Sequence, residues 1–319
     1  MQLISFVIPC YRSANTIGIV VQEITDVIAQ RSDTFDYEII LVNDASPDNT
    51  LDVIRKLCAE DMRIKALNLS RNFGQHPAVM AGFGAARGDL VVSMDDDGQT
   101  PASEVFRMIE KLEEGYDIVF ARYQKEERRS WFRRIGTEGK EAMNRIMLGK
   151  PKEIVFNSFF VVRRYVVQEV IKYINPYPYL GGLLYRTSSN VANIDVHHRK
   201  RAAGSSTYTI HKLIRIILNE MTSFSVKPLR IATLMGSVLA AIGFLFMLAV
   251  ILRRALQPGI PAGWSSIISI MLFLGGMQMI LLGIIGEYIG RIYICLNKTP
   301  QYVIKETINM FSREKEEKK

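Results

Sequence analysis

Cysteine is scarce in this chain. Its 319 residues include three cysteines, Cys10, Cys58 and Cys295, which lie far apart and form no CxxC pair. This spacing argues against a disulfide framework and against a cysteine-ligated metal cluster, and it suits a reducing compartment. The N-terminus lacks a basic leading region, and its apolar run stops at Pro9, so we predict no signal peptide there.

Acidic residues are fewer than basic ones. The chain has 40 Lys and Arg against 32 Asp and Glu, a formal net charge of +8. This balance favours an anionic partner, either nucleic acid, anionic lipid or a phosphorylated substrate. Hydrophobic residues make up 48 % of the chain and charged residues 23 %, which suits a globular protein with an additional apolar part.

Before residue 227 the chain has no long apolar segment, and short apolar runs alternate with amphipathic stretches. We predict strands at 3–8, 37–42, 64–69, 90–94 and 118–121, with helices at 15–29, 48–59, 76–86 and 103–114. Apolar strands between helices of this length indicate an α/β fold with a mostly parallel, Rossmann-like sheet. In such sheets ligands bind beyond the carboxyl ends of the strands, so the residues that follow each strand are the site candidates.

Two long apolar segments follow, at 229–252 and 264–285. Each is long enough for a helix to span a bilayer core, although two buried core helices are the alternative. The connector 253–263 contains two prolines and two glycines, so we predict a transmembrane hairpin over 227–292. Basic residues flank its outer ends, and the positive-inside rule then predicts that the soluble domain lies in the cytoplasm, despite Arg253 and Arg254 in the connector.

Residues 208–226 carry apolar side chains at helical spacing. This pattern predicts an amphipathic helix along the bilayer surface, and a core-facing helix fits it equally well. The predicted organisation is therefore a catalytic domain at 1–207, a juxtamembrane helix at 208–226, the hairpin at 227–292 and a C-terminal tail at 293–319.

Three consecutive acids, Asp95, Asp96 and Asp97, follow the predicted strand at 90–94. Carboxylates at i and i+2 point to the same side of an extended chain. Hard oxygen ligands of this kind suit Mg²⁺ or Mn²⁺ shared with a diphosphate. Because three adjacent acids repel one another without a cation, we favour a metal site over a solvated acidic turn.

Other candidates for the same edge follow the first two strands. Asp44 follows the strand at 37–42, where a carboxylate can accept a hydrogen bond from a nucleotide base or ribose. On spacing alone, an N-cap for the next helix is equally favoured. Pro9 and Tyr11 end the first strand at this edge, and the ring of Tyr11 is suited to stacking on a base.

Two basic groups complete the candidates. The first, at 122–134, includes Arg122 and Arg133 beside Trp131 and Phe132, and the second is 199–201, directly before 204–208. Guanidinium groups bind phosphates bidentately. A membrane hairpin would hold such groups against lipid headgroups, so we predict an anionic lipid partner and no nucleic acid.

These motifs resemble those of a known family. The chain is similar to polyprenyl-phosphate glycosyltransferases, namely dolichol-phosphate mannose synthase and the bacterial undecaprenyl-phosphate glucosyl- and aminoarabinose transferases. The resemblance rests on Val7-Ile8-Pro9-x-Tyr11, Arg71-Asn72-Phe73-Gly74-Gln75-His76 and Glu287-Tyr288-Ile289-Gly290-Arg291. It implies a GT-A fold and inverting transfer of one sugar from a nucleotide sugar, usually a UDP-sugar, to undecaprenyl phosphate at the bacterial inner membrane. It also implies a homo-oligomer, a tetramer in relatives.

The resemblance also implies roles for individual residues. The nucleotide-binding residues are Pro9, Tyr11 and Asp44. The metal ligands, in a DxDxQ motif, are Asp95, Asp97 and Gln99. The residues facing the donor diphosphate or the acceptor phosphate are Arg122, Arg133 and Arg201, and those matching part of a GxSKY motif are Ser206 and Tyr208. Of these, we assign catalytic roles to Asp97, Arg133 and Arg201.

The chain departs from the family pattern at several positions. Many members have Gly-Asp-Phe-Arg, with the Asp proposed as base, where this chain has Asn157-Ser158-Phe159-Phe160. Thr207 also replaces the lysine of GxSKY. The residue that would act as a base is therefore not assigned. The changes at these positions are also consistent with a different sugar substrate or with an impaired enzyme. An acceptor phosphate needs no strong base, because its second pKa is about 6.

Two other functions are the rivals. A processive polysaccharide synthase would carry a Gln-x-x-Arg-Trp motif, and neither tryptophan lies in that context. A membrane adaptor would bind nucleotide sugar or anionic lipid without turnover.

Overall fold

The computed structural model describes residues 1–123, 145, 148–196, 199 and 263–310, with scattered helical residues between 229 and 252. The chain divides into two compact units. Met1–Ile216 and Thr299–Lys319 form the unit that contains the sheet, and Ile217–Lys298 form the unit that contains a long apolar helix.

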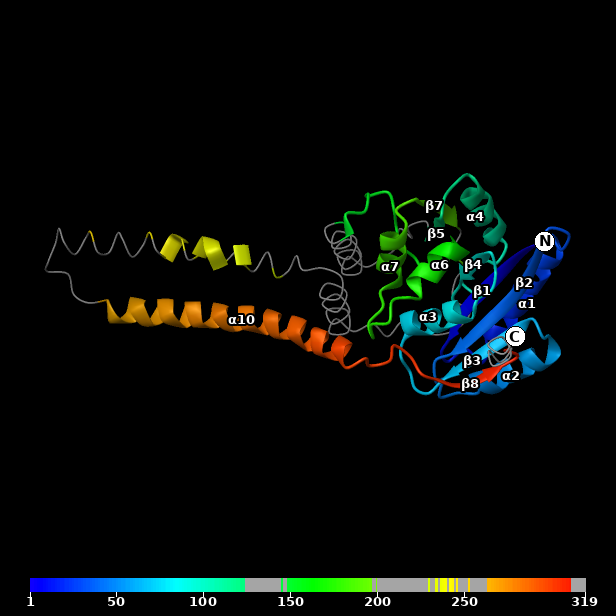
Figure 1. The fold of residues 1–319 in the computed structure, drawn as a ribbon, viewed down its shortest axis with the longest axis horizontal. Helices are drawn as coiled ribbons and strands as arrows, with labels where there is room; N and C mark the ends of the chain where they lie inside the picture. The colour runs from blue at the N-terminus through cyan, green and yellow to red at the C-terminus, as the bar shows by residue number, and fades with distance from the viewer. Residues whose placement is uncertain are drawn as a thin grey trace, which may run out of the picture. The chain divides into compact units, whose positions relative to one another are not determined.

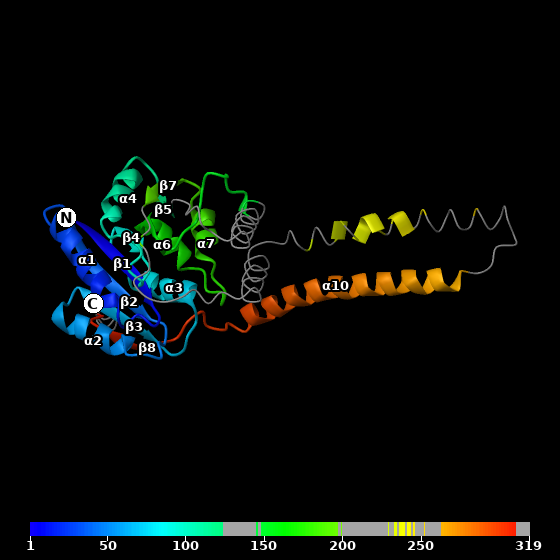
Figure 2. The same cartoon turned by 180° about the vertical axis from the view of Figure 1, so that it is seen from behind.

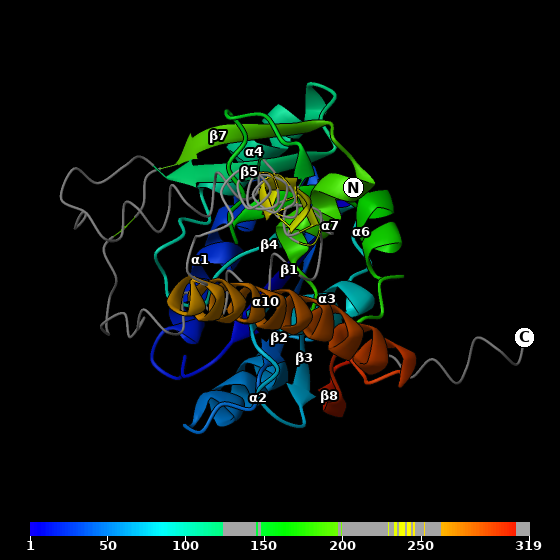
Figure 3. The same ribbon diagram turned by 90° about the vertical axis from the view of Figure 1, so that its left-hand side faces the viewer.

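Among the described residues, eight strands form one mixed sheet (Figure 1). The strands are β1 Gln2–Cys10, β2 Phe35–Asn43, β3 Ile64–Leu69, β4 Leu90–Ser93, β5 Ile118–Tyr123, β6 Phe160–Arg163, β7 Val191–Val196 and β8 Ile304–Ile308. Their order is β7-β5-β6-β4-β1-β2-β3-β8, so β7 and β8 lie at opposite edges (Figure 3). Strands β1 to β4 pair in parallel, as do β5 and β7, whereas β6 and β8 run antiparallel to their neighbours.

Helices cover both faces of this sheet (Figures 1 and 2). One face packs against α1 Ile17–Ala29, α2 Thr50–Glu60 and α4 Glu104–Glu113. The other is covered by α3 Gln75–Ala85, α6 Arg164–Val170 and α7 Leu180–Thr187. Gly82 allows α3 to approach the sheet closely, because a Cβ there would lie 2.3 Å from Val7 Cγ1. This approach packs α3 against β1 and β2.

The predicted α/β fold is confirmed, because the five predicted strands overlap β1 to β5 and the four predicted helices overlap α1 to α4. The predicted strands end with 118–121, whereas the sheet contains two further strands after it in the sequence, β6 and β7. Strand β6 inserts antiparallel between β4 and β5, and β7 pairs with the outer edge of β5.

The chain returns to the sheet after its long apolar helix. Strand β8 pairs antiparallel with β3. Gln301 is buried and its Nε2 donates to the carbonyl of Asn175 at 2.8 Å. The prediction assigned residues 293–319 to a tail, whereas 304–308 form an edge strand of the sheet.

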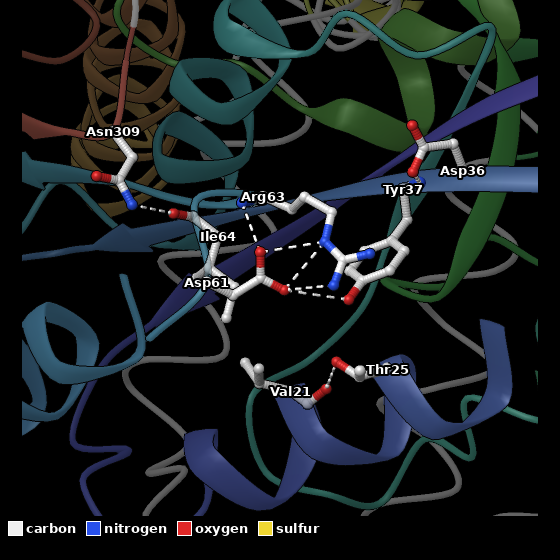
Figure 4. Close-up of polar contacts among 8 residues, drawn as sticks. All are labelled: Val21, Thr25, Asp36, Tyr37, Asp61, Arg63, Ile64 and Asn309. Carbon is white, nitrogen blue, oxygen red and sulfur yellow. Dashed lines mark hydrogen bonds and ion pairs between the residues drawn. The ribbon is translucent and has the colours of Figure 1, made fainter. Parts of the chain in front are cut away.

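Polar contacts hold the beginning of β3, at the edge where the central parallel strands start (Figure 4). Arg63 donates to Asp61, with Nη2 2.8 Å from Oδ2, and its Cζ lies 4.3 Å from the centroid of the Tyr37 ring. Asn309, directly after β8, donates from Nδ2 to the carbonyl of Ile64 at 2.9 Å and to that of Cys58 at 2.6 Å. These contacts fasten the C-terminal strand at the edge opposite to the site candidates.

Helix α10, Trp264–Leu296, lies in the second unit. Its part Phe273–Leu296 is the one helix in the described residues that is long and apolar enough to cross a membrane. The predicted apolar segment 264–285 lies in this helix. The predicted segment 229–252 contributes only scattered described residues, all helical, and the predicted amphipathic helix at 208–226 lies outside the described residues.

Candidate active site

Six loops meet at one edge of the sheet. Strands β1, β2, β4, β5 and β7 all end there, and β6 begins there because it runs antiparallel. The loops contain the candidates Tyr11, Asp44 and Asp95, and also Ser158, while Arg122 lies at the end of β5, at the same edge. The strand directions thus bring together residues that are far apart in the sequence.

Asp96 joins the end of β4 to the loop after β1. Its Oδ2 accepts a hydrogen bond from the backbone N–H of Tyr11 at 3.0 Å and another from Ser13 Oγ. Burial raises the pKa of Asp96, and the hydrogen bond from Ser13 opposes this rise. The middle acid of the run therefore orders the loop that contains Tyr11.

Asp95 is held by two side chains from other loops. Its Oδ1 accepts from Gln75 Nε2 at 2.8 Å, and its Oδ2 accepts from Ser158 Oγ at 2.5 Å. Burial raises the pKa of Asp95 to about 6, and the charges of Asp97 and Asp96 add to the rise. A cation at this edge would relieve the same repulsion.

Asp97 and Gln99 form the next part of the loop. Asp97 Oδ1 accepts from the backbone N–H of Gln99 at 3.1 Å. The Gln99 side-chain Nε2 donates to the carbonyl of Arg199 at 3.2 Å, and the Arg199 N–H donates to the carbonyl of Gln99 at 3.1 Å. Arg199 Nη1 in turn lies 2.9 Å from Glu23 Oε2. The second basic group therefore begins beside the acidic loop.

Asp44 holds the loop that leads into α3. Its two oxygens accept from the backbone N–H groups of Phe73 at 2.7 Å and Gly74 at 2.8 Å. Burial raises the pKa of Asp44 against the effect of these two bonds. The N-cap alternative is wrong, because α2 begins at Thr50, whose N–H bonds to Asp48 instead.

The loops after β1 and β2 both contain a left-handed residue other than glycine. Arg12 has φ +60° and Ala45 has φ +50°. The N–H of Arg12 donates to Ser46 Oγ at 3.2 Å, so the two loops support each other. Such strained conformations gather at functional sites. Beside them Tyr11 is 44 % exposed, and the Arg12 Cζ lies 5.6 Å from the centroid of its ring.

Arg122 forms an ion pair across the sheet. Its Nε lies 2.6 Å from Oδ1 of Asp195, its partner in the β5–β7 register. Both side chains are about half exposed, so the pair is at the rim of the site. The guanidinium predicted to face phosphate therefore has one of its donors already engaged.

The remaining candidates divide into two groups. Pro9 is opposite Val42 at the end of β1. The four that lie outside the described residues are Arg133, Arg201, Ser206 and Tyr208.

Sequence reasoning missed the two partners of Asp95. Gln75 was noted only within a family motif, and Ser158 only as a departure from one. The N–H of Ser158 donates to Asn157 Oδ1 at 2.7 Å, and Asn157 Nδ2 donates to the carbonyl of Ala121 at 3.0 Å. No spacing rule predicts these contacts, because they join β4, α3, β5 and β6.

The comparison with known families decides the identity. The model for glycosyl transferase family 2 matches residues 5–171, more than half of the chain. The chain belongs to glycosyltransferase family 2. A second model, the GtrB C-terminal hairpin, matches residues 227–292 of this family 2 enzyme.

Curated relatives extend over almost the whole chain. The undecaprenyl-phosphate 4-deoxy-4-formamido-L-arabinose transferase of Proteus mirabilis (strain HI4320) is 32 % identical over 310 residues, covering 96 % of this chain and 94 % of the relative. The uncharacterized glycosyltransferase YkcC of Bacillus subtilis (strain 168) is 31 % identical over 306 residues, covering 95 % and 93 %. The predicted resemblance to polyprenyl-phosphate glycosyltransferases is confirmed.

Solved structures agree with the fold of this family 2 domain. Glucosyl-3-phosphoglycerate synthase from Mycobacterium tuberculosis, in complex with Mn²⁺, UDP-glucose and phosphoglyceric acid, has a TM-score of 0.52 and 16 % identity, covering 70 % of this chain and 79 % of that one. The structure of the same enzyme with phosphoglyceric acid has a TM-score of 0.53 and 19 % identity, with the same coverage of both chains. At this identity the likeness shows the fold alone, a GT-A-like mixed α/β sheet.

Proposed function

We propose that this enzyme transfers a single sugar from a UDP-sugar to undecaprenyl phosphate, with inversion at the anomeric carbon. The observation that carries the proposal is the combination of two features in one chain. A family 2 domain gathers three carboxylates at one sheet edge, and the same chain contains an apolar helix of membrane-spanning length. The relative named for undecaprenyl phosphate, aligned over 96 % of the chain, supports this acceptor.

We further propose that Mg²⁺ or Mn²⁺ binds at Asp95, Asp97 and Gln99. Within the described ranges no group of three or more His, Cys, Asp or Glu side chains is arranged to hold a metal ion by itself. Mg²⁺ commonly takes only one or two carboxylates and completes its shell with waters and substrate phosphates. The donor set therefore fits an ion shared with the donor diphosphate. When bound, the ion would neutralise charge on the leaving diphosphate.

The reaction is a displacement at the anomeric carbon. An oxygen of the acceptor phosphate forms the new bond to this carbon on the face opposite to the diphosphate. The bond from the carbon to the diphosphate oxygen breaks, and its electron pair leaves with UDP. A phosphate monoester is already anionic at pH 7, because its second pKa is about 6. Positioning of the two substrates, more than proton removal, then supplies the rate.

The candidate residues are proposed to bind different parts of the two substrates. Tyr11 presents an exposed ring for the nucleotide base beside Pro9, and Asp44 holds the neighbouring loop at 73–74. Arg122, Arg133 and Arg201 are the proposed phosphate ligands, with Ser206 and Tyr208 on the acceptor side. The excess of arginine and lysine over acids favours such anionic substrates.

We propose that 227–292 is a two-helix membrane hairpin preceded by an amphipathic helix at 208–226. The match to the GtrB C-terminal hairpin and the apolar part of α10 support this arrangement. The basic residues that flank the hairpin favour a catalytic domain on the cytoplasmic side of the bacterial inner membrane. By family resemblance the enzyme is a homo-tetramer.

Turnover with defined substrates tests the proposal. The full chain, purified in detergent, is mixed with undecaprenyl phosphate, Mg²⁺ or Mn²⁺, and one UDP-sugar at a time. We expect UDP release that requires both lipid and cation with one donor. Mass spectrometry of the lipid should then show a gain of one sugar residue.

Other outcomes favour the rivals. A ladder of lipid-independent products would indicate a processive synthase. Tight UDP-sugar binding without any lipid product, across the whole donor panel, would indicate an adaptor and overturn the proposed activity.

A further inference from the structure

Both oxygens of Asp95 are engaged by neutral donors from two different elements. Gln75 is the first residue of α3, and Ser158 lies two residues before β6. Gly74, before Gln75, has φ +95°, a conformation that favours glycine and turns the chain into the helix. Asp95 is therefore held between the two elements, 2.8 Å from Gln75 Nε2 and 2.5 Å from Ser158 Oγ.

Ser158 is itself oriented by its neighbours. Its N–H donates to Asn157 Oδ1, and Asn157 is anchored to the carbonyl of Ala121 at the end of β5. A serine hydroxyl has a single proton to donate. The Asp95 oxygen at 2.5 Å is a better acceptor for it than Asn157 Oδ1 at 3.3 Å. The hydroxyl proton is thus directed to the carboxylate.

The charge of residue 158 matters at this distance. Asp95 is already followed directly by Asp96 and Asp97. An acid at position 158 would add a further carboxylate within hydrogen-bond range of Asp95, and the two like charges would repel each other. A neutral hydroxyl instead stabilises the ionised carboxylate by a charge-assisted hydrogen bond.

We propose that Ser158 and Gln75 are positioning residues that hold the ionised Asp95 carboxylate in one orientation toward the cation and the diphosphate of the donor. Position 158 in this chain therefore supplies an orienting hydroxyl and no general base. The inference rests on the proposed function, since it assumes that Asp95 faces a cation–diphosphate group. A carboxylate fixed from two sides needs no reorganisation when that group arrives.

The test measures donor binding as well as turnover. Calorimetry of the full chain with Mn²⁺ and UDP gives the dissociation constant, and steady-state assays give kcat and KM for donor and lipid. We expect Ser158→Ala to weaken Mn²⁺–UDP binding about 10- to 100-fold, as expected for loss of a hydrogen bond to a charged group. Ser158→Thr keeps the hydroxyl, so its dissociation constant for Mn²⁺–UDP should stay within about 3-fold of that of the parent. KM for the lipid should change little in either variant.

Two further variants extend the test to the other partner and to charge. Gln75→Ala removes the second donor from a different element, so it should weaken Mn²⁺–UDP binding in the same way even where Ser158→Ala folds poorly. Ser158→Asp adds a carboxylate and should weaken binding at least as much as Ser158→Ala.

Ser188 provides a matched control. Its hydroxyl donates to Asp117 Oδ2 at 2.7 Å, a serine–aspartate pair at the other end of the β5–β7 pairing, where both strands begin. Ser188→Ala should leave Mn²⁺–UDP binding unchanged. All variants should keep the circular dichroism of the parent.

Three results would overturn the inference. If Ser158→Ala and Gln75→Ala bind Mn²⁺–UDP as tightly as an active parent, the positioning role is wrong while the proposed function stands. A Ser158→Asp variant with a higher kcat than the parent would instead make position 158 a weakened base site. If the parent binds neither Mn²⁺ nor UDP, the inference and the proposed function fall together.

Discussion

Three adjacent carboxylates at the end of β4 contact different partners. Strand β4 ends at Ser93 and the chain bends at Asp96 and Asp97, so the three side chains reach different neighbours. Asp96 reaches the loop of Tyr11, and Asp95 reaches Ser158 and Gln75. The acid run therefore combines a loop anchor with a ligand site, and the effect of a substitution should depend on which acid is changed.

Asp97→Asn should remove metal-dependent turnover and leave the fold intact. Neutralising a carboxylate that faces the cation is expected to lower kcat by about 100-fold or more, because electrostatic groups at the reacting centre act with this strength. Titration of Mg²⁺ and Mn²⁺ in the lipid-dependent assay checks this. Asp52→Asn, on the exposed first turn of α2, is the control and should be neutral. Undiminished metal-dependent activity of Asp97→Asn would refute the metal assignment.

The cysteines should be unreactive in the folded sheet domain. Cys10 and Cys58 are buried, and this burial raises the pKa of Cys10 well above its usual value and that of Cys58 to about 11. Because the thiolate is the reactive form, both should resist alkylation at pH 8. A thiol count should give at most one reactive cysteine, Cys295, in native protein and three after denaturation. Rapid native labelling of two or more would contradict the packing.

At the scale of elements, a buried polar ladder crosses the three central parallel strands. Glu38 on β2 accepts from Ser5 Oγ on β1 at 2.5 Å and from the N–H of Arg87 at 2.7 Å, and it pairs with Lys65 on β3. Burial opposes ionisation of Glu38, but the hydrogen bonds from Lys65 and Ser5 outweigh it and lower its pKa. Removal of one partner would leave an unpaired buried charge.

Glu38→Gln should lower the free energy of unfolding by about 3 kcal/mol at pH 7, because Lys65 would keep its charge without a partner. The folded pKa of Glu38 lies below its unfolded value of 4.5, so its contribution is complete above that pH. The contribution is lost as pH falls through the folded pKa, and the difference between variant and parent should then shrink. Denaturant unfolding between pH 7 and pH 3 measures this.

The exposed pair of Glu169 and Lys172 supplies the control for that experiment. Its side chains are 52 % and 67 % exposed, so Glu169→Gln should change stability by less than about 1 kcal/mol at any pH. A Glu38→Gln variant as stable as the Glu169→Gln variant at pH 7 would show that the ladder contributes nothing.

The elements that sequence could predict are those with local signals. Strands β1 to β5 are apolar runs between helices, and their hydrophobic period marks them. Strand β8, with the sequence Ile-Lys-Glu-Thr-Ile, is a partly exposed edge strand whose partner β3 lies more than 200 residues earlier. Strand β6 has only four residues. Nothing local reports pairings of this kind, because non-local contacts decide them.

The same limit applies to the site. The strand ends predicted the edge at which Tyr11, Asp44 and Asp95 gather, because that follows from the parallel direction of the strands. The sequence could not predict that Asp44 would accept hydrogen bonds from backbone N–H groups, or that the Ser158 hydroxyl would contact Asp95. The Asp44 bonds depend on the fold of the loop before α3, and the Ser158 bond depends on how β6 inserts beside β4. No spacing in the sequence expresses either arrangement.

At the scale of the whole molecule, the chain leaves the sheet unit before the apolar helix and re-enters it afterwards. Thr299 onward belongs to the sheet unit, whereas Ile217–Lys298 form the other. Gln301, β8 and Asn309 fix the returning segment at three points. The chain thus enters the sheet unit from both ends of the apolar unit. Strand β8 covers the edge of β3 that would otherwise be open.

This arrangement predicts the effect of two truncations. A chain that ends after residue 310 keeps every contact described for the returning segment and should unfold like the full chain. A chain that ends after residue 298 exposes the backbone donors and acceptors of β3, and open edges promote aggregation. We expect its midpoint of thermal unfolding to fall by about 5 °C or more, since a loss of 1 kcal/mol shifts a domain of this size by about 2–4 °C.

A peptide with the sequence of residues 299–310 makes this prediction specific to strand pairing. Added to the chain that ends after 298, it should restore part of the lost stability by adding a strand at β3. The same peptide with Ile304, Thr307 and Ile308 changed to proline cannot donate to the ladder at these positions and should have no effect. Glu306→Gln in the full chain removes the partly exposed ion pair with Arg55 and keeps an oxygen that can accept from Asn68, so it should change stability by less than about 1 kcal/mol. If the chain that ends after 298 is as stable and soluble as the full chain, β8 does not contribute to the stability of the sheet.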